Sequence, residues 1–258
     1  MPNPCFYPGV MPTPFRPQVT PYCPGLDQPG HFFVRIALAF LAALIVAPAA
    51  AQVPPSPTEI AAYAGLHAAA AKGDAAAIAR LIAAGQDVNG IDAAKRTPLH
   101  VAAHLRHPAA VTALIKGGAN PNALEMQRYD IVTIASVNND LPTLKAALDG
   151  GCSAKNITSP YDGTALIAAA HLGHADVVRM LIAAGAPLDH VNNLHWTALI
   201  ESIVLGDGGK RHTDTLDALV KAGANLNLAD RAGATPLRLA KSRGYAEMVK
   251  ILEAAGAR

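Results

Sequence analysis

The sequence predicts an all-α solenoid, a stack of about six helix-turn-helix repeats with β-turns at their tips. Two kinds of recurring motif carry this prediction. Helix starts of the form Thr-Pro-Leu stand at residues 97–99 and 235–237. Apolar helical segments that end in glycine recur every 33 or 34 residues, with one gap of 38, and their glycines are Gly85, Gly118, Gly151, Gly185, Gly223 and Gly256. A fixed period in this range is typical of stacked-repeat proteins.

The region before the repeats has two parts. Residues 1–34 are an irregular Pro-rich extension, and we hypothesise that translation starts near Val34, so that this extension is not translated. Residues 35–51 resemble a signal peptide: Arg35 precedes twelve apolar residues, and small residues lead to a cleavage site after Ala51. The apolar run is shorter than the roughly 20 residues of a membrane span. We therefore expect a periplasmic or secreted protein, the alternative being an uncleaved anchor.

The remaining chain divides into a linker and six units. Residues 52–59 are rich in proline and are expected to act as a tether. The repeat domain then covers residues 60–258. Its repeats are expected at residues 60–91, 92–124, 125–158, 159–191, 192–229 and 230–258.

The second repeat gives the clearest local signals. Thr97 is a favoured N-cap residue, and Pro98 suits the first helical position because its missing amide costs nothing there. A second helix presents Val111, Leu114 and Ile115 on one face, at spacings of three and four residues. Gly118 can end that helix in the left-handed conformation. Each unit is thus expected to run turn, helix, short loop, helix.

The recurring Thr-Pro-Leu-His, Ala-Ala, Gly-His or Gly-Asp, Leu-Ile and Gly-Ala-Asn motifs resemble ankyrin repeats over roughly residues 60–258. The third repeat departs most, because Tyr129 to Ala135 carries neither the proline nor the histidine of that pattern. The resemblance implies a module that binds a folded protein through the concave face formed by its first helices and turn tips. It also implies structural roles for His67, His100, His107 and His174.

An insertion distinguishes the fifth repeat. Leu199 and Gly223 are 24 residues apart, whereas Leu99 and Gly118 are 19 apart. The extra residues fall within 206–212 and are expected to form a loop between the two helices. Such loops often lie on the binding face of a repeat array, although a tolerated insertion without function is the alternative because longer loops cost little stability.

Composition and motifs give little support to catalysis or nucleic-acid binding. The formal net charge is +2, without the basic stripe that nucleic acid requires. No P-loop, dinucleotide-binding or zinc-protease motif occurs. The pairs His104/His107 and His171/His174 should lie about 20 Å apart, given a repeat spacing of about 10 Å, too far for one metal site. Cys152 is expected to be a small buried residue. We therefore expect no enzyme activity, metal or cofactor.

The resemblance assigns the partner-binding residues by position. Tyr129, Tyr161 and Trp196 are expected at three successive tips, where aromatic side chains often dominate binding energy. The alternative is that each aromatic side chain covers a neighbouring turn. We expect a monomer that binds one or more proteins; the alternatives are an accessory factor for a periplasmic redox or metal enzyme and a membrane-tethered spacer. The predicted contact residues are Arg96, His104, Leu105, Met126, Tyr129, Asn138, Tyr161, His171, Leu172, Leu194, Trp196, Leu205, Lys210, Arg211, His212 and Arg231.

Overall fold

A computed structural model describes residues 52–258, and this part of the chain is helical throughout. It contains thirteen α-helices and, apart from one isolated bridge between Thr158 and Gly163, no strand pairing. None of the helices in this part is long and apolar enough to cross a bilayer. The predicted extension at residues 1–34 and the predicted signal peptide at residues 35–51 lie outside the described residues.

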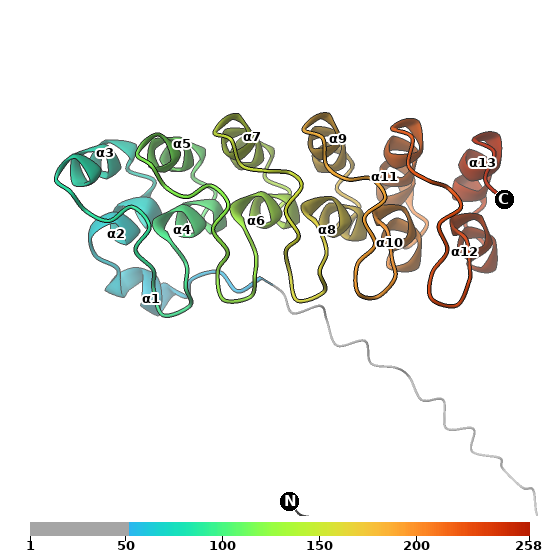
Figure 1. Cartoon of the computed structure of the whole chain (residues 1–258), viewed down its shortest axis with the longest axis horizontal. Helices are drawn as coiled ribbons and strands as arrows, with labels where there is room; N and C mark the ends of the chain where they lie inside the picture. The colour runs from blue at the N-terminus through green and yellow to red at the C-terminus, as the bar shows by residue number, and fades with distance from the viewer. Residues whose placement is uncertain (1–51) are drawn as a thin grey trace, which may run out of the picture. The chain divides into compact units, whose positions relative to one another are not determined.

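The helices of the repeats form two layers, as the repeat pattern predicts (Figure 1). The first helix of each repeat lies in one layer, the second helix in the other. The first helices are α2 (Gly65–Lys72), α4 (Pro98–His104), α6 (Ile131–Val137), α8 (Ala165–Leu172), α10 (Ala198–Val204) and α12 (Pro236–Ser242). The second helices are α3 (Ala75–Ala83), α5 (Pro108–Lys116), α7 (Leu141–Asp149), α9 (Ala175–Ala183), α11 (Lys210–Lys221) and α13 (Ala246–Ala254).

Helix starts follow the expected capping chemistry. The Thr97 hydroxyl accepts from the backbone amide of His100, and the His100 side chain reaches back to the Thr97 amide, which completes a capping box. Thr235 caps α12 in the same position. The third repeat replaces threonine by Asp130, whose carboxylate accepts from the amide of Thr133 at 2.8 Å. The motif was lost there, but its function was retained.

The second helices end and pack as predicted. The glycine after each of them has a positive φ, for example +91° at Gly118, a conformation that L side chains rarely adopt. Leu114 and its counterparts Leu181, Leu219 and Leu252 are fully buried, as is Ala147 in the third repeat. The core is therefore a column of side chains in which each repeat buries its neighbour's apolar face.

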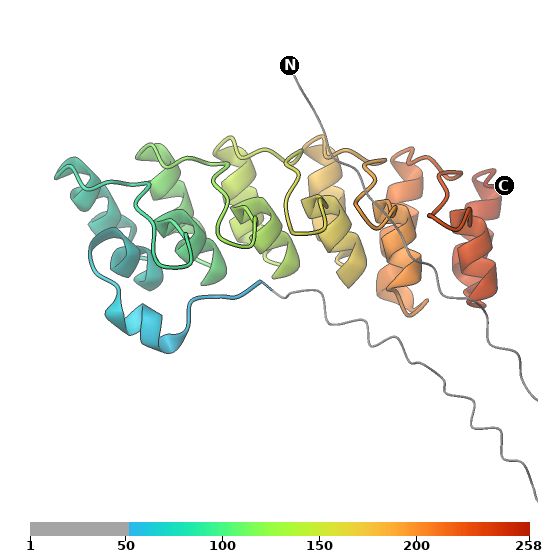
Figure 2. The same cartoon turned by 60° about the horizontal axis from the view of Figure 1, so that its bottom comes forward.

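The prediction that residues 52–59 act as a tether is wrong, because this segment makes contacts with the repeats. Pro57–Ala62 forms a further helix, α1, with Ser56 and Glu59 in a capping box at its start. Figure 2 shows α1 (blue), with the segment before it, beside the first repeats. We call residues 52–63 the strap. Its contacts with the repeats are described with the candidate site.

The insertion in the fifth repeat is also more ordered than predicted. Helix α11 has 12 residues where the other second helices have 9, so Lys210, Arg211 and His212 belong to its first turn rather than to a loop. The loop itself is short and packed: the Tyr245 hydroxyl donates to the Gly206 carbonyl at 2.8 Å. The extra residues therefore extend a helix and join it to the last repeat.

Candidate protein-binding face

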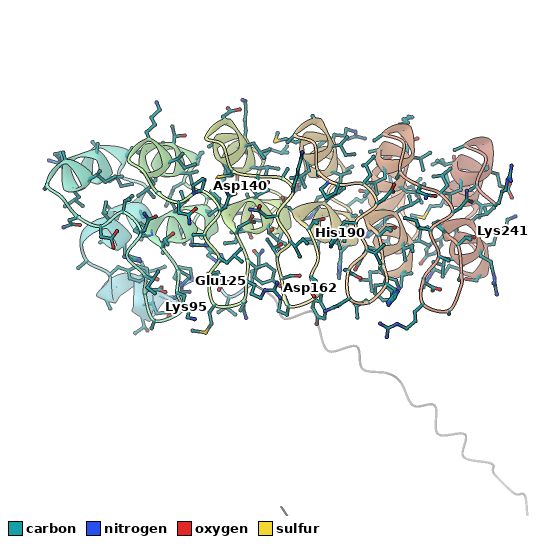
Figure 3. The ribbon with its side chains drawn as sticks, in the orientation of Figure 1. Lys95, Glu125, Asp140, Asp162, His190 and Lys241 are labelled. Carbon is teal, nitrogen blue, oxygen red and sulfur yellow. The ribbon has the colours of Figure 1, made fainter. Side chains whose placement is uncertain are left out.

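Five hairpin-like turns, which we call fingers, connect the repeats and extend beyond the layer of first helices (Figure 1). Each finger is closed by a backbone hydrogen bond, such as that from the Asp92 amide to the Arg96 carbonyl at 3.0 Å. The fingers, numbered 1 to 5, comprise residues 91–96, 124–129, 157–163, 191–196 and 229–234. In Figure 3, the labels Lys95, Glu125 and Asp162 mark fingers 1, 2 and 3.

Hydrogen bonds join successive fingers into one surface. The Met126 amide donates to the Ala94 carbonyl at 3.0 Å, and the Ser159 amide donates to the Arg128 carbonyl at the same distance. Finger 4 continues the series through the Asn193 amide and the Tyr161 carbonyl. We call the surface made by the fingers and the ends of the first helices the finger face. The hydrogen bonds set the spacing of neighbouring fingers along this face.

A row of exposed aliphatic side chains runs along this face. One residue of each of the first four fingers, always the first, contributes to it, and these residues are 42–62% exposed. Two further apolar residues at the tips of fingers 2 and 4, Met126 and Leu194, are 56% and 40% exposed and lie outside the row. The residues of the row are Ile91, Leu124, Ile157 and Val191. The predicted contacts included Met126 and Leu194 but missed the row, although its members recur with the repeat period.

Arg96 was predicted as an exposed tip residue, and this is wrong because only 1% of it is exposed. Its guanidinium forms ion pairs with Glu59 of the strap and with Asp92, the latter at 2.7 Å from Nε to Oδ2. It also donates to the Val53 carbonyl at 3.3 Å. The strap therefore covers the finger residue that was expected to meet a partner.

The acid that holds Arg96 is itself stabilised as a carboxylate. Burial alone would raise the pKa of Asp92, but hydrogen bonds from the Tyr63 hydroxyl and from Arg96 outweigh it, so this pKa lies below its ordinary value. The strap also reaches finger 2, where the Val53 amide donates to Gln127 at 3.3 Å. Fingers 1 and 2 are thus partly occupied by the chain's own N-terminal segment.

Two other predicted contacts are buried. Tyr129 closes finger 2 and lies in the core cluster, so it is not an exposed tip. His212 is held by its neighbours, with Nε2 3.0 Å from the His171 carbonyl and Nδ1 2.9 Å from Asp207. Tyr161 is half-buried, but the residue of finger 3 that corresponds to Tyr129 is Gly163, because that finger has one extra residue. The predicted row of three aromatic tips is therefore absent from the described array.

The other predicted contacts remain accessible. His104, Leu105, Asn138, His171, Leu172 and Leu205 are partly exposed at the ends of the first helices. Trp196 is half-buried at the end of finger 4. Lys210, Arg211 and Arg231 are exposed, with the Lys210 ammonium 2.6 Å from Asp214 and Arg231 donating to the Asn193 carbonyl at 3.1 Å.

Most histidines serve the fold. His67 lies 3.0 Å from the Arg96 carbonyl, His107 3.1 Å from the Ala71 carbonyl, and His174 3.0 Å from the Ser136 carbonyl, which confirms the structural roles that the resemblance implied. Within residues 52–258 no three metal-binding side chains cluster. Cys152 is buried, and burial raises the pKa of its thiol to about 12, so it resembles a core residue rather than a nucleophile.

Paired helices, connecting fingers and a shared core define a class of solenoid proteins that bind through an extended surface. The sequence matches the family described as ankyrin repeats (3 copies) over residues 53–125 and 132–230, more than half of the chain. The chain belongs to the ankyrin repeat family. Ankyrin repeats are generally modules of protein–protein interaction.

Individual relatives agree with this assignment. The putative ankyrin repeat protein YahD of Escherichia coli K12 is 36% identical over 125 residues, which cover 48% of this chain and 62% of YahD. An ankyrin repeat domain from Acinetobacter baumannii AYE is 42% identical, with a TM-score of 0.71 over 75% of this chain and 98% of that one. The ankyrin repeat domain of Bcl-3 is 27% identical, with a TM-score of 0.68 over 76% and 87% of the two chains.

Proposed function

We propose that this chain is a non-catalytic binding module that holds a folded protein partner in the periplasm through its finger face. The aliphatic row supports this proposal. Exposed apolar side chains gathered on one face are candidates for an interaction site, and Ile91, Leu124, Ile157 and Val191 repeat at one fixed position of successive fingers. A rigid partner surface could cover neighbouring members of this row at once.

The strap limits which part of the face is open. It holds Arg96 at finger 1 and Gln127 at finger 2, whereas fingers 3 to 5 make no hydrogen bond or ion pair with the strap. The partner should therefore contact mainly fingers 3 to 5 and helices α8 and α10.

A crosslinked pull-down from periplasm tests the proposal, followed by binding measurements with the partner that it identifies. Ile157→Asp and Val191→Asp, in fingers 3 and 4, each place a charge in the aliphatic row and should weaken binding at least tenfold. The control is Ala109→Asp, which adds the same charge at an exposed position of the second-helix layer. A partner that binds both row variants at full strength would place the interface elsewhere.

The proposed location depends on the predicted signal peptide and has its own test. Cleavage after Ala51 would leave the strap complete, because its contacts begin at Val53. N-terminal sequencing of the periplasmic protein should therefore start at Gln52. A mature protein that retains residues 36–47 would favour the membrane-tethered spacer instead. The accessory-factor alternative has less support, because His67, His107 and His174 are engaged with backbone carbonyls.

A further inference from the structure

Glu201, in helix α10 of the fifth repeat, is a buried carboxylate with one unused oxygen. Only 3% of the residue is exposed. Its Oε1 accepts a hydrogen bond from Nδ2 of Asn192, in finger 4, at 3.0 Å. No donor among residues 52–258 makes a hydrogen bond to Oε2. A buried oxygen without a hydrogen bond lowers the stability of the folded protein. Such a group in a folded protein therefore calls for an explanation, and binding of a ligand is one.

The His171 side chain covers this oxygen. Its Nδ1 lies 3.4 Å from Oε2 of Glu201, at the long end of hydrogen-bond distances, and 36% of the side chain is exposed. Within the described part of the chain, no hydrogen bond fixes the imidazole ring. His171 projects from α8, which packs beside α10, and its partly exposed ring lies between Glu201 and solvent. Rotation of one partly exposed side chain would open Oε2 to the finger face.

Finger 1 provides an internal comparison for what such an acid binds. There, Asp92 at the second position of the finger is paired with the guanidinium of Arg96 at the last position. The corresponding residues of finger 4 are Asn192 and Trp196. The fifth repeat thus keeps an acid at the junction of finger and helix, in Glu201, with the imidazole of His171 beside it in place of a guanidinium. The nearest finger arginine in sequence, Arg231, donates instead to the Asn193 carbonyl.

We propose that Glu201 is a recognition site for an arginine side chain of the protein partner. The guanidinium displaces the His171 ring and donates to Oε2 of Glu201. A planar guanidinium has several donors in a fixed arrangement that matches a carboxylate, and charge-assisted hydrogen bonds of this kind are stronger than neutral ones. This inference rests on the proposed function, because it names the chemistry that the partner brings to the same face.

A metal ion fits the site less well than a guanidinium. Only His171 and Glu201 would supply ligands, and in the described residues no third histidine, cysteine or acid joins them. Structural zinc sites use four ligands and catalytic ones at least three. Zinc binding is therefore an outcome of the test rather than the expectation.

The test uses a small arginine mimic and the purified, ¹⁵N-labelled protein. N-acetyl-arginine methylamide should produce saturable NMR shifts at the backbone amides of α8 and α10. N-acetyl-citrulline methylamide, which has nearly the same shape without the charge, should produce none. Absence of saturable shifts with the arginine probe, or equal shifts with both probes, would overturn the inference. So would Zn²⁺ binding at these amides that excludes the arginine probe.

Two variants should change probe binding in opposite directions. Glu201→Gln should weaken it at least tenfold, whereas His171→Ala should strengthen it severalfold because the covering ring is gone. Glu247→Gln, which removes an exposed carboxylate in α13, is the matched control and should bind the probe like the unmodified protein. Weaker binding by His171→Ala, or unchanged binding by Glu201→Gln, would contradict the inference. If Glu201→Gln does not fold, the His171→Ala and citrulline comparisons still decide it.

The result can be separated from the proposed function. If a partner binds through the finger face but is insensitive to Glu201→Gln, and the arginine probe fails, only the inference is wrong. If the probe binds at Glu201 but no partner depends on the aliphatic row, the proposed function is wrong and the arginine site remains.

Discussion

Fingers 1 and 4 have the same backbone design but treat a buried acid differently. In finger 1, Asp92 is paired with Arg96, and Glu59 of the strap binds the same guanidinium from the other side. In the fifth repeat, Glu201 receives one hydrogen bond from Asn192, and its second oxygen meets only the His171 imidazole, at 3.4 Å. The acid of finger 1 is paired with a guanidinium that the strap also holds, whereas the second oxygen of Glu201 is covered only by the partly exposed ring of His171.

This difference shows how the two ends of a nearly periodic array can come to differ in their surface chemistry. The repeats supply the same scaffold six times, so the backbone alone gives no preference for either end. Side chains at equivalent positions, such as Arg96 and Trp196, decide whether the acid beside a finger has a cationic partner within the chain. The following experiments test this comparison, beginning with the largest expected effect.

Arg96→Met should break the ion pairs of finger 1 and lower the unfolding free energy by about 3 kcal/mol, because Asp92 is left buried without its cation. Urea titration followed by circular dichroism measures this. The control is Arg128→Met in finger 2, whose pair with Asp162 at 2.9 Å is about half-exposed and should contribute no more than about 1 kcal/mol. Equal losses for the two variants would mean that the strap does not bury Arg96 in solution.

Acid should weaken the second repeat through His100, whose pKa is lowered to about 4 by burial. The unfolded chain takes up this proton below about pH 6.5, whereas the folded protein resists until about pH 4. The unfolding free energy should therefore have its full value above pH 6.5. It should fall by about 3 kcal/mol as the pH is lowered from 6.5 to about 4.

The fifth repeat has Ile200 at the position of His100 and should not contribute in this way. Urea midpoints at pH 7, 5.5 and 4.5 measure the effect. The matched variant is His100→Thr, which copies Thr133 of the third repeat and should reduce the pH dependence. Some dependence should remain, since burial also lowers the pKa of His104 to about 4. A midpoint that does not move with pH in the unmodified protein would contradict the prediction.

Trp196→Ala should weaken binding of the partner by about 2 kcal/mol, because an aromatic side chain at finger 4 is a candidate centre of the interface. Folding should be largely unaffected, since the residue is only half-buried. Isothermal titration with the identified partner measures the change. Lys95→Ala, at the tip of the covered finger 1, is the control and should leave affinity within about threefold, close to the error of such comparisons. The reverse order of sensitivity would put the partner at the strap end.

Glu201→Gln should raise the unfolding free energy by about 1 kcal/mol, the smallest effect, because a neutral amide replaces a buried carboxylate that lacks a second partner. The hydrogen bond from Asn192 can still form to the amide oxygen. Thermal unfolding measures the change, with Glu247→Gln as the exposed control. A clear loss of stability in Glu201→Gln would mean that Oε2 is already satisfied in the folded protein.

The sequence was sufficient to predict the array because its local signals agree. Thr97 caps a helix, Gly118 ends one with a positive φ, and Leu114 is buried, each for a reason that depends on a few neighbouring residues. The role of His100, which bridges Thr97 and the Ala123 carbonyl, also follows from its position in the motif. These features repeat with the period, so an error at one repeat is corrected by the others.

The surface was harder to predict because exposure depends on segments far apart in the chain. Arg96 meets Glu59 and Val53, which are 37 and 43 residues away. Tyr161 was misaligned by the extra residue of finger 3, which no motif reveals. The aliphatic row could have been predicted from the sequence, because Leu124 and Ile157 stand at equivalent positions of successive repeats.

The strap gives the array an internal competitor. It is joined to α2 through Ala64, so its local concentration at fingers 1 and 2 is in the millimolar range, as for other short tethers. A partner present at micromolar concentration must exceed the strap's affinity by about a thousandfold to displace it from Arg96 and Gln127. The same partner meets no competitor at Val191 or Leu194. We therefore expect access along the face to be graded, so that a partner of the proposed kind would bind the C-terminal repeats before it displaces the strap from the first ones.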